Sequence, residues 1–145
     1  MKKIKLLACI QDINALIVRY VEAELRDKAQ RHIKYSHYEI LRLLHIFKQL
    51  SMKELSLKIN KHKSTVTALT KKLMKHEFVE INKDKKDERK QMLKLTQKGK
   101  KFAPIINSIE QKILININQN LHVIEQNSML KNLNNMHENL KIKVG

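Results

Sequence analysis

Hydroxylated and cationic side chains occupy one face of a predicted helix over residues 64–76, a pattern that suits contacts to nucleic acid. Val66, Leu69 and Leu73 fall on the opposite, apolar face at helical spacing. Short side chains at the start of a helix let it approach base edges, while lysines behind them reach phosphates. The candidate DNA contacts on this helix are Ser64, Thr65, Thr67, Ala68, Lys71 and Lys72.

A charged loop follows the helix and adds a second group of cations. The loop, residues 83–88, contains no hydrophobic residue, and alternating apolar residues on either side of it predict two strands. A basic hairpin beside such a helix is suited to phosphates or to a minor groove. Its candidate DNA contacts are Lys85 and Lys86, and its strands are marked by Val79, Ile81, Leu93 and Leu95.

The charge distribution indicates a polyanionic partner. The 145 residues carry a net charge of +16, and residues 61–101 hold 14 Lys and Arg against 5 Asp and Glu. Residues 102–145 hold only 4 against 3, so the excess lies where the predicted helix and hairpin lie. A lysine-rich composition that served only solubility would be spread evenly, and the concentration therefore favours nucleic acid.

Catalysis and export find no support in the sequence. It contains no nucleophile next to a general base, no Gly-rich phosphate loop and no cluster of metal ligands. The single Cys excludes an intrachain disulfide. Residues 6–9 resemble the end of a lipoprotein signal, but Lys5 limits that apolar run to four residues, and a signal needs about 7–15. We expect a cytoplasmic protein without a membrane span, enzymatic activity, cofactor or metal.

The segments that hold these side chains are mostly predicted helices. Ser51, with Glu54 three residues later, forms a capping box that starts a helix at Met52. Asn60 tolerates the left-handed backbone that a tight turn needs, so we expect this helix to stop there and the DNA-contacting helix to follow. The buried residues of the helix from Met52 are expected to be Leu55 and Ile59.

Four further helices are predicted from apolar residues at three- and four-residue spacing. The first is long and amphipathic, Ser36 caps the second, Thr96 caps the fifth, and the last follows His122. Pro104 should mark a bend inside the fifth. The apolar positions are Ile4, Leu7, Ile10 or Cys9, Ile13, Leu16 or Ile17, Tyr20 and Leu25 in the first helix, Ile40, Leu41, Leu44 and Phe47 or Ile46 in the second, and Met129, Leu133, Met136 and Leu140 in the last.

Together these segments resemble the MarR family of transcriptional regulators over essentially the full length. The resemblance is most specific in residues 54–73, in residues 87–89 (Asp-Glu-Arg) and in residues 95–99 (Leu-Thr-Gln-Lys-Gly). It implies a mainly α protein with a small β-hairpin wing. A winged helix-turn-helix domain would span residues 35–101, and residues 1–34 and 102–145 would form a helical dimerisation region. The first, fifth and last helices are too apolar on one side for a small monomer to hide, which agrees with a dimer.

The resemblance also implies roles for wing residues. Arg89 at the tip would enter the minor groove, Asp87 would brace it by a salt bridge, and the two recognition helices of a dimer would read a palindromic operator. Three positions depart from the family pattern. Glu77 replaces a Gly after the recognition helix, Ile81 replaces an Arg in the first wing strand, and Lys61 replaces a small apolar residue in the turn. A left-handed turn at Glu77 would cost roughly 1 kcal/mol.

Members of this family are usually released from DNA by a signal, and Cys9 and Tyr35 are the candidate sensing residues. Cys9 lies where the peroxide-sensing, OhrR-like branch carries its reactive Cys. Tyr35 falls on one of the two tyrosines expected near that thiol, and Ala23 stands at the other. The alternative is that Cys9 is one more small hydrophobic residue in a dimer helix.

Two other signals remain open. Residues 12–15 resemble a zinc-responsive branch, and His32 and His37 lie near Glu39, but residues 102–120 lack the His pair that this branch needs. The other signal, which is the usual one in the family, is a small aromatic or acidic inducer that binds in a cleft between the dimerisation helices and the DNA-binding domains.

The function hypothesis is a homodimeric, sequence-specific repressor or activator that binds double-stranded DNA. The alternative is a constitutive basic or architectural nucleic-acid-binding protein without a sensor.

Overall fold

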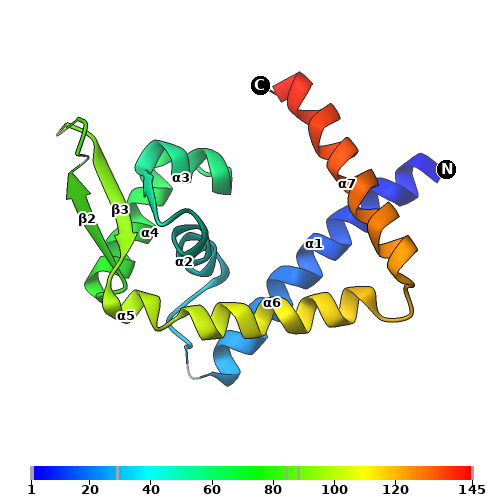
Figure 1. Cartoon of the computed structure of the whole chain (residues 1–145), viewed down its shortest axis with the longest axis horizontal. Helices are drawn as coiled ribbons and strands as arrows, with labels where there is room; N and C mark the ends of the chain where they lie inside the picture. The colour runs from blue at the N-terminus through cyan, green and yellow to red at the C-terminus, as the bar shows by residue number, and fades with distance from the viewer. Residues whose placement is uncertain (1, 29, 84, 88, 145) are drawn as a thin grey trace. The chain divides into compact units, whose positions relative to one another are not determined.

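The computed structural model describes residues 2–28, 30–83, 85–87 and 89–144, and most of them are helical (Figure 1). The chain forms two compact units, residues 1–110 and residues 111–145. The elements in chain order are α1 (Lys2–Asp27), α2 (Tyr35–Phe47), β1 (Gln49–Ser51), α3 (Met52–Ile59), α4 (Lys63–Lys75), β2 (Val79–Lys83), β3 (Gln91–Leu95), α5 (Gln97–Lys100), α6 (Ala103–Asn118) and α7 (Val123–Val144). Among the described residues, no helix is both long and apolar enough to cross a bilayer.

Apolar faces at helical spacing build the core of residues 1–110. As predicted, α2 buries Ile40, Leu41 and Leu44, whereas the predicted contact through Phe47 or Ile46 is wrong, since these side chains are 47% and 49% exposed. The reason is that α2 ends at Phe47, where Lys48 turns the backbone to a φ of 69°. The other fully buried large side chains are Val21, Leu25, Leu55, Val66, Leu73, Leu93, Ile106 and Ile109.

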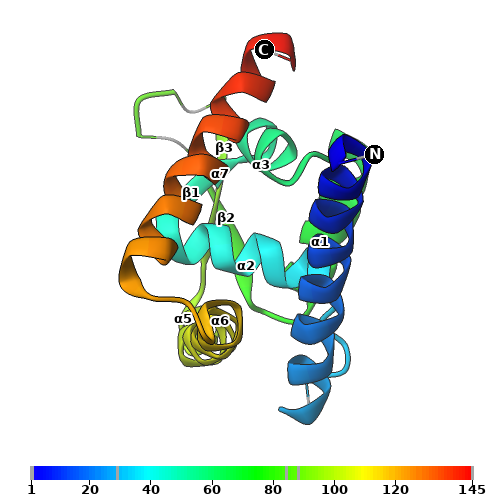
Figure 2. The same cartoon turned by 90° about the vertical axis from the view of Figure 1, so that its right-hand side faces the viewer.

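The N-terminal half of α1 lies outside that core. Figure 2 shows α1 as one continuous helix, and its residues 5–16 are all exposed. The helix reaches the core through Val21 and Leu25, each 1% exposed. The large apolar side chains left exposed on its first half are Leu6, Leu7, Ile10, Ile13 and Leu16.

The small sheet has the strand order β1-β3-β2 and is antiparallel throughout. The predicted hairpin is confirmed, with Ile81 opposite Leu93 and Lys83 opposite Gln91. Strand β1 was not predicted, because its three residues are too few to show an alternating pattern. It places Leu50 opposite Leu93, and these two side chains tie the hairpin to the core.

The predicted fifth helix is two helices in the structure. The Thr96 cap is confirmed, since its hydroxyl accepts the N–H of Gly99 at 3.0 Å. Helix α5 ends at Lys100, and α6 begins at Ala103, so Pro104 lies in the first turn of a new helix. The missing N–H of a proline costs nothing there.

Residues 111–145 comprise the rest of α6 and all of α7, joined at Asn120, whose φ is 66°. None of the side chains described over residues 111–143 is buried. The large apolar side chains exposed there are Leu114, Ile115, Ile117, Val123, Ile124, Leu130, Leu133, Leu140 and Ile142. Exposed apolar surface of this extent is typical of helices that pack against another surface.

Candidate nucleic-acid interface

The first helix of the helix-turn-helix is fixed at both ends by its own residues. The capping box is confirmed: the Ser51 hydroxyl accepts the N–H of Glu54 at 3.2 Å, and the Glu54 carboxylate accepts the N–H of Ser51 at 2.7 Å. The hydrogen bond from the Ser51 backbone, followed by one from the Ser51 side chain, lowers the pKa of the Glu54 carboxyl group. At the other end Asn60 has the left-handed backbone expected of it, with a φ of 53°.

Hydrogen bonds between Ser56 of α3 and the backbone of Lys61 set how α4 follows α3. The Ser56 hydroxyl donates to the carbonyl of Lys61, and the Lys61 N–H donates to the carbonyl of Ser56 at 3.2 Å. Helix α4 then begins at Lys63, one residue before the predicted start, with His62 as its N-cap. Lys63 is thereby an exposed cation in the first turn of α4, which the sequence analysis did not include among the candidate contacts.

Helix α4 presents the predicted face to solvent. The side chains of Ser64, Thr65, Ala68, Lys71 and Lys72 are exposed. Val66 and Leu73 are buried as predicted, and the third buried position is Thr70 rather than Leu69, which is half-buried. Thr70 can be buried because its hydroxyl donates to the carbonyl of Val66 at 2.9 Å.

Thr67 is half-buried, and its hydroxyl is already engaged inside the helix. It donates to the carbonyl of Lys63 at 2.8 Å. Because its proton is used in this way, the Thr67 hydroxyl can only accept a hydrogen bond from a base. The amino groups of adenine and cytosine are the donors that it could bind in the major groove. The side chains of Ser64 and Thr65, by contrast, lie on the exposed surface.

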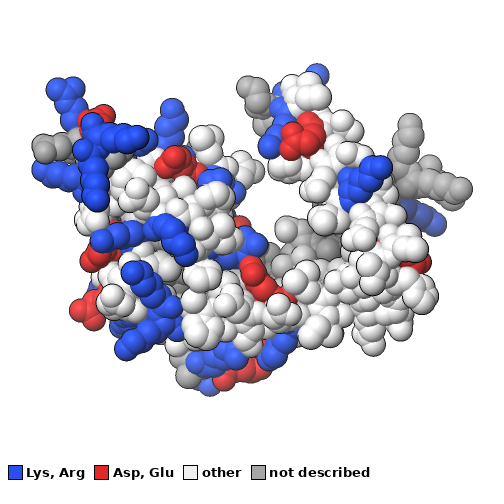
Figure 3. Space-filling view, viewed as in Figure 1, with Lys and Arg blue, Asp and Glu red and all other residues white. Residues whose placement is uncertain are grey.

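The wing carries the second group of cations, and Figure 3 shows Lys and Arg predominating over β2, β3 and the described residues between them. Lys85, Lys86, Asp87 and Arg89 are all exposed. The predicted salt bridge between Asp87 and Arg89 is absent from the described part of the wing. Instead the Asp87 carboxylate accepts the backbone N–H of Arg89 at 3.0 Å. A local bond of this kind shapes the turn, whereas an exposed ion pair would add little stability.

The base of the wing is joined to the end of α4. Glu77 takes the left-handed backbone foreseen from the missing Gly, with a φ of 61°. The Phe78 N–H donates to the carbonyl of Leu73 at 2.9 Å, and the Thr96 hydroxyl donates to the carbonyl of Glu77. This closes the helix with a Schellman motif and sets the direction in which the wing leaves it.

The two candidate sensing residues do not meet within one chain. The Tyr35 N–H donates to the Glu22 carboxylate at 3.3 Å, which places Tyr35 beside the C-terminal part of α1. Cys9 is exposed, and at the rise of an α-helix it lies roughly 20 Å along α1 from Glu22. Burial, and then Glu39, raise the pKa of Tyr35. A thiol and tyrosine pair would therefore need a second copy of the chain.

The histidines near α2 are placed for packing. In the described chain, no group of three metal-ligating side chains is assembled. His37 is buried, and its Nδ1 accepts the N–H of Lys34 at 3.2 Å. His32 lies against His76, with ring centroids 4.7 Å apart. The sequence did not reveal this contact, because the two rings come from segments 44 residues apart.

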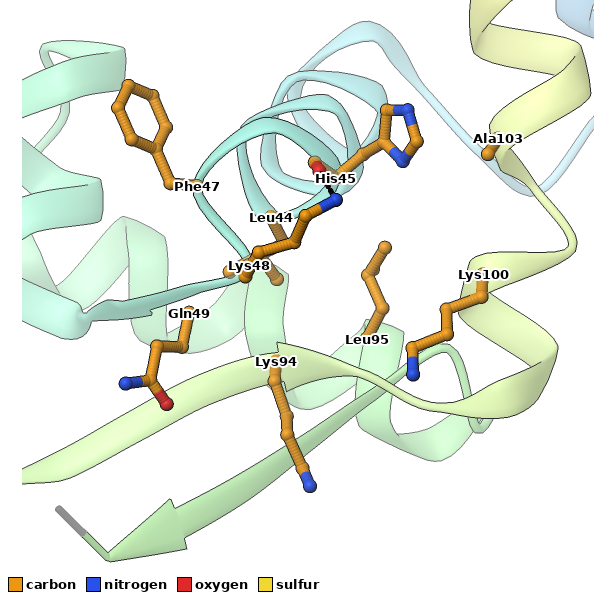
Figure 4. Close-up of a pocket in the computed structure, with 9 residues that line it drawn as sticks. All are labelled: Leu44, His45, Phe47, Lys48, Gln49, Lys94, Leu95, Lys100 and Ala103. Carbon is orange, nitrogen blue, oxygen red and sulfur yellow. Dashed lines mark hydrogen bonds between the residues drawn. The ribbon is translucent and has the colours of Figure 1, made fainter. Parts of the chain in front are cut away.

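A cavity of about 600 Å³ opens between the end of α2, β1, β3 and the start of α6 (Figure 4). Leu44 and Leu95 lie at its buried side, and the Lys48 amine donates to the carbonyl of His45 at 2.9 Å. Lys94 is engaged elsewhere, since its amine pairs with Glu80 at 3.1 Å. The lining residues are Leu44, His45, Phe47, Lys48, Gln49, Lys94, Leu95, Lys100 and Ala103.

Comparison with known proteins identifies similar chains. The model of the MarR family matches residues 33–90. The HTH-type transcriptional regulator SarZ of Staphylococcus epidermidis is 29% identical over 106 residues, which cover 69% of this chain and 72% of SarZ. A MarR transcriptional regulator from Methanosarcina mazei superposes with a TM-score of 0.83 at 22% identity, covering 94% of this chain and 97% of that one. A mutant of MarR from E. coli, solved in complex with operator DNA, superposes with a TM-score of 0.73 at 19% identity, covering 93% and 95%.

Proposed function

Because this chain belongs to the MarR family of DNA-binding transcriptional regulators, which are not enzymes, we propose that it is a homodimer that recognises a palindromic operator in the cytoplasm. The observation that carries the proposal is the exposed face of α4, where hydroxyls precede lysines on a helix fixed by the turn before it. Each α4 would enter a major groove, with phosphates contacted by the lysines.

The proposed DNA contacts are the residues that the sequence pointed to. Base edges would be read from the start of α4, and the wing would place Arg89 in the adjacent minor groove, with its backbone held by Asp87. The full set is Ser64, Thr65, Thr67, Ala68, Lys71, Lys72, Lys85, Lys86, Asp87 and Arg89.

Dimerisation would use the apolar surface that a single chain leaves uncovered. The exposed leucines and isoleucines of α1 and α7 support a dimerisation region of residues 1–34 and 102–145, with residues 35–101 as the DNA-binding domain. An interface made of such side chains would be largely apolar and insensitive to salt.

We further propose that a signal releases the dimer from DNA, either a small molecule or an oxidant acting at Cys9 with Tyr35 of the second copy. The exposure of Cys9 supports access by an oxidant. The net charge of +16 favours one other reading, a constitutive basic protein that binds DNA without sequence preference.

In vitro selection from a random duplex library tests the proposal. Affinity for the selected duplex and for a scrambled copy is then measured over a range of salt concentrations. A specific regulator should prefer its own site by about 10³-fold or more at physiological salt. A preference below about tenfold would favour the architectural protein, for which phosphate contacts supply nearly all of the affinity.

A further inference from the structure

His37 occupies an unusual place for an ionisable side chain, buried in the first turn of α2. It is 5% exposed, and its Nδ1 accepts the N–H of Lys34, the N-cap residue of the helix, at 3.2 Å. That bond satisfies one of the N–H groups that a helix start leaves without an intrahelical partner. A histidine ring accepts at Nδ1 only when it is neutral, because the imidazolium carries a hydrogen on both nitrogens.

The charged groups that act on His37 are all basic. They are Lys72 and His76 at the end of α4, and His32 in the connection between α1 and α2. Burial, followed by these charges, lowers the pKa of His37 to about 4. Burial, His76, Lys72 and Lys98 of α5 lower the pKa of His32 as well.

Ring contacts hold the same connection on the end of α4. The His32 ring lies 4.7 Å from that of His76 and stacks on Phe78 at 6.2 Å between centroids. The Lys98 amine lies 5.0 Å from the centroid of the Phe78 ring, so a proton on His32 would stand among cations. Contacts between two histidine rings are stable while at least one ring is neutral, since two imidazolium rings repel each other.

The capped segment joins α1 to the DNA-reading part of the chain. Ile33, 2% exposed, anchors it, and the next residue after the cap, Tyr35, donates its N–H to the Glu22 carboxylate of α1. A change at this cap therefore acts where α1 meets the domain that holds the proposed DNA contacts.

We propose that His37 is a titratable helix cap, which holds the connection between α1 and α2 against α4 at neutral pH and releases it in mild acid, weakening operator binding. The held segment keeps His37 neutral, whereas a released segment exposes a histidine of ordinary pKa, near 6.5. Protons therefore favour the released form. The equilibrium between the held and the released form is therefore independent of pH above about 6.5. As the pH falls from there toward about 4, it shifts toward the released form by about tenfold per pH unit.

Hydrogen exchange in the unliganded protein tests the cap directly. We would follow the backbone amides of Lys34 and Tyr35 by NMR from pH 7.5 to 4.5, each relative to the amide of Leu93 in β3, which corrects for the pH dependence of exchange. The protection of both amides should fall about tenfold per unit below pH 6.5. In His37→Gln the fall should become clearly shallower, because a Gln side chain at the third helical position can accept the same N–H at every pH and His32 is then the histidine of the connection that still titrates. His122→Gln, outside the cluster, should behave as the native chain.

Flat protection in the native chain, or an equal fall in His37→Gln, would overturn the proposal. If His37→Gln does not fold, His32→Gln with His76→Gln serves instead. Loss of these neighbouring basic groups should raise the pKa of the His37 ring in NMR titration, and an unmoved titration would count against the mechanism.

The effect on DNA is measured separately, so that the two proposals can fail independently. The probe is the duplex obtained by selection, and the readout is its affinity at pH 7.5 and 5.5 for native protein and His37→Gln. Acid should weaken the native protein relative to the variant by up to about tenfold. An equal change of affinity in both proteins would show that release of the cap does not affect DNA binding, which would overturn its regulatory role. Failure to select any duplex would instead count against operator recognition and leave the cap itself to the hydrogen-exchange experiment.

Discussion

The backbone carbonyl of Phe78 lies against Gly99, so closely that a β-carbon at residue 99 would overlap it. This carbonyl is also held in place, because it accepts the N–H of Thr96 at 3.1 Å. Glycine is thus required here by close approach of two backbone segments rather than by its own dihedral angles. The contact fixes α5 to the residue from which the wing begins.

Gly99→Ala should therefore destabilise the protein by about 1–3 kcal/mol, the usual cost of forcing extra atoms into a packed site. The carbonyl cannot swing aside without breaking its bond to Thr96. Urea denaturation measures the change, with Gln97→Ala, an exposed position in the same short helix, as the control. A variant as stable as the native chain would show that the Phe78 carbonyl can move away from residue 99 at little cost, which would contradict this prediction.

Glu77→Gly should change stability in the opposite direction. Glu77 holds a φ of 61°, which strains any residue with a β-carbon, so glycine should stabilise the fold by about 1 kcal/mol. Glu77→Ala is the matched control, since it removes the carboxylate and keeps the strain. Equal stability of the Gly and Ala variants in urea would exclude backbone strain as the cause.

Local signals in the sequence predicted the helix-turn-helix well. The capping box of Ser51 and Glu54, and the left-handed Asn60, each depend on residues within a few positions of one another. Strand β1 was missed because its pairing with β3 joins residues more than forty apart, and three residues carry no period of their own. The burial of Thr70 was missed because helical spacing does not show which polar group can satisfy itself on its own backbone.

The candidate site was predicted by residue type but not in its finer contacts. Exposure of Ser64 and Lys71 followed from the apolar face opposite them. The turn at Asp87 was expected to hold the Arg89 side chain, whereas its carboxylate binds the Arg89 backbone, a choice that depends on local loop geometry. The separation of Cys9 from Tyr35 could not be predicted, because it depends on where along α1 the start of α2 packs, and composition and periodicity do not show this.

Lys71→Ala and Arg89→Ala should both weaken DNA binding with little change in thermal stability, because both side chains are exposed. Each lost phosphate contact should reduce the slope of log affinity against log salt by about one unit. Ser64→Ala should instead alter preference among selected sequences at constant salt slope. Lys131→Ala, on the exposed surface of α7, is the control for charge alone. Unchanged affinity, slope and sequence preference in all three variants would place the DNA surface elsewhere.

Leu133→Asp with Leu140→Asp should yield unfolded or aggregated protein. These side chains are 49% and 69% exposed in a single chain, so the substitution is tolerable in a monomer and costly only if a second copy covers them. Asn134→Asp adds a charge to another face of the same helix and should leave the dimer intact. Sedimentation equilibrium at low and high salt reports the assembly, and a stable, folded monomer of the native chain would contradict the proposed architecture.

The Cys9 prediction concerns the signal. A sensing thiol must be reachable, and Cys9 is exposed on the first half of α1. With one Cys per chain, a Cys9 sulfenic acid has no second thiol in its own chain, so it can form a mixed disulfide or a disulfide between two chains, or be oxidised further. We expect stoichiometric hydroperoxide to lower operator affinity in the native protein. Cys9→Ser should bind equally well before and after treatment, because Cys9 lies outside the proposed DNA contacts. Undiminished binding in all four samples would assign Cys9 to packing and leave a small molecule as the inducing signal.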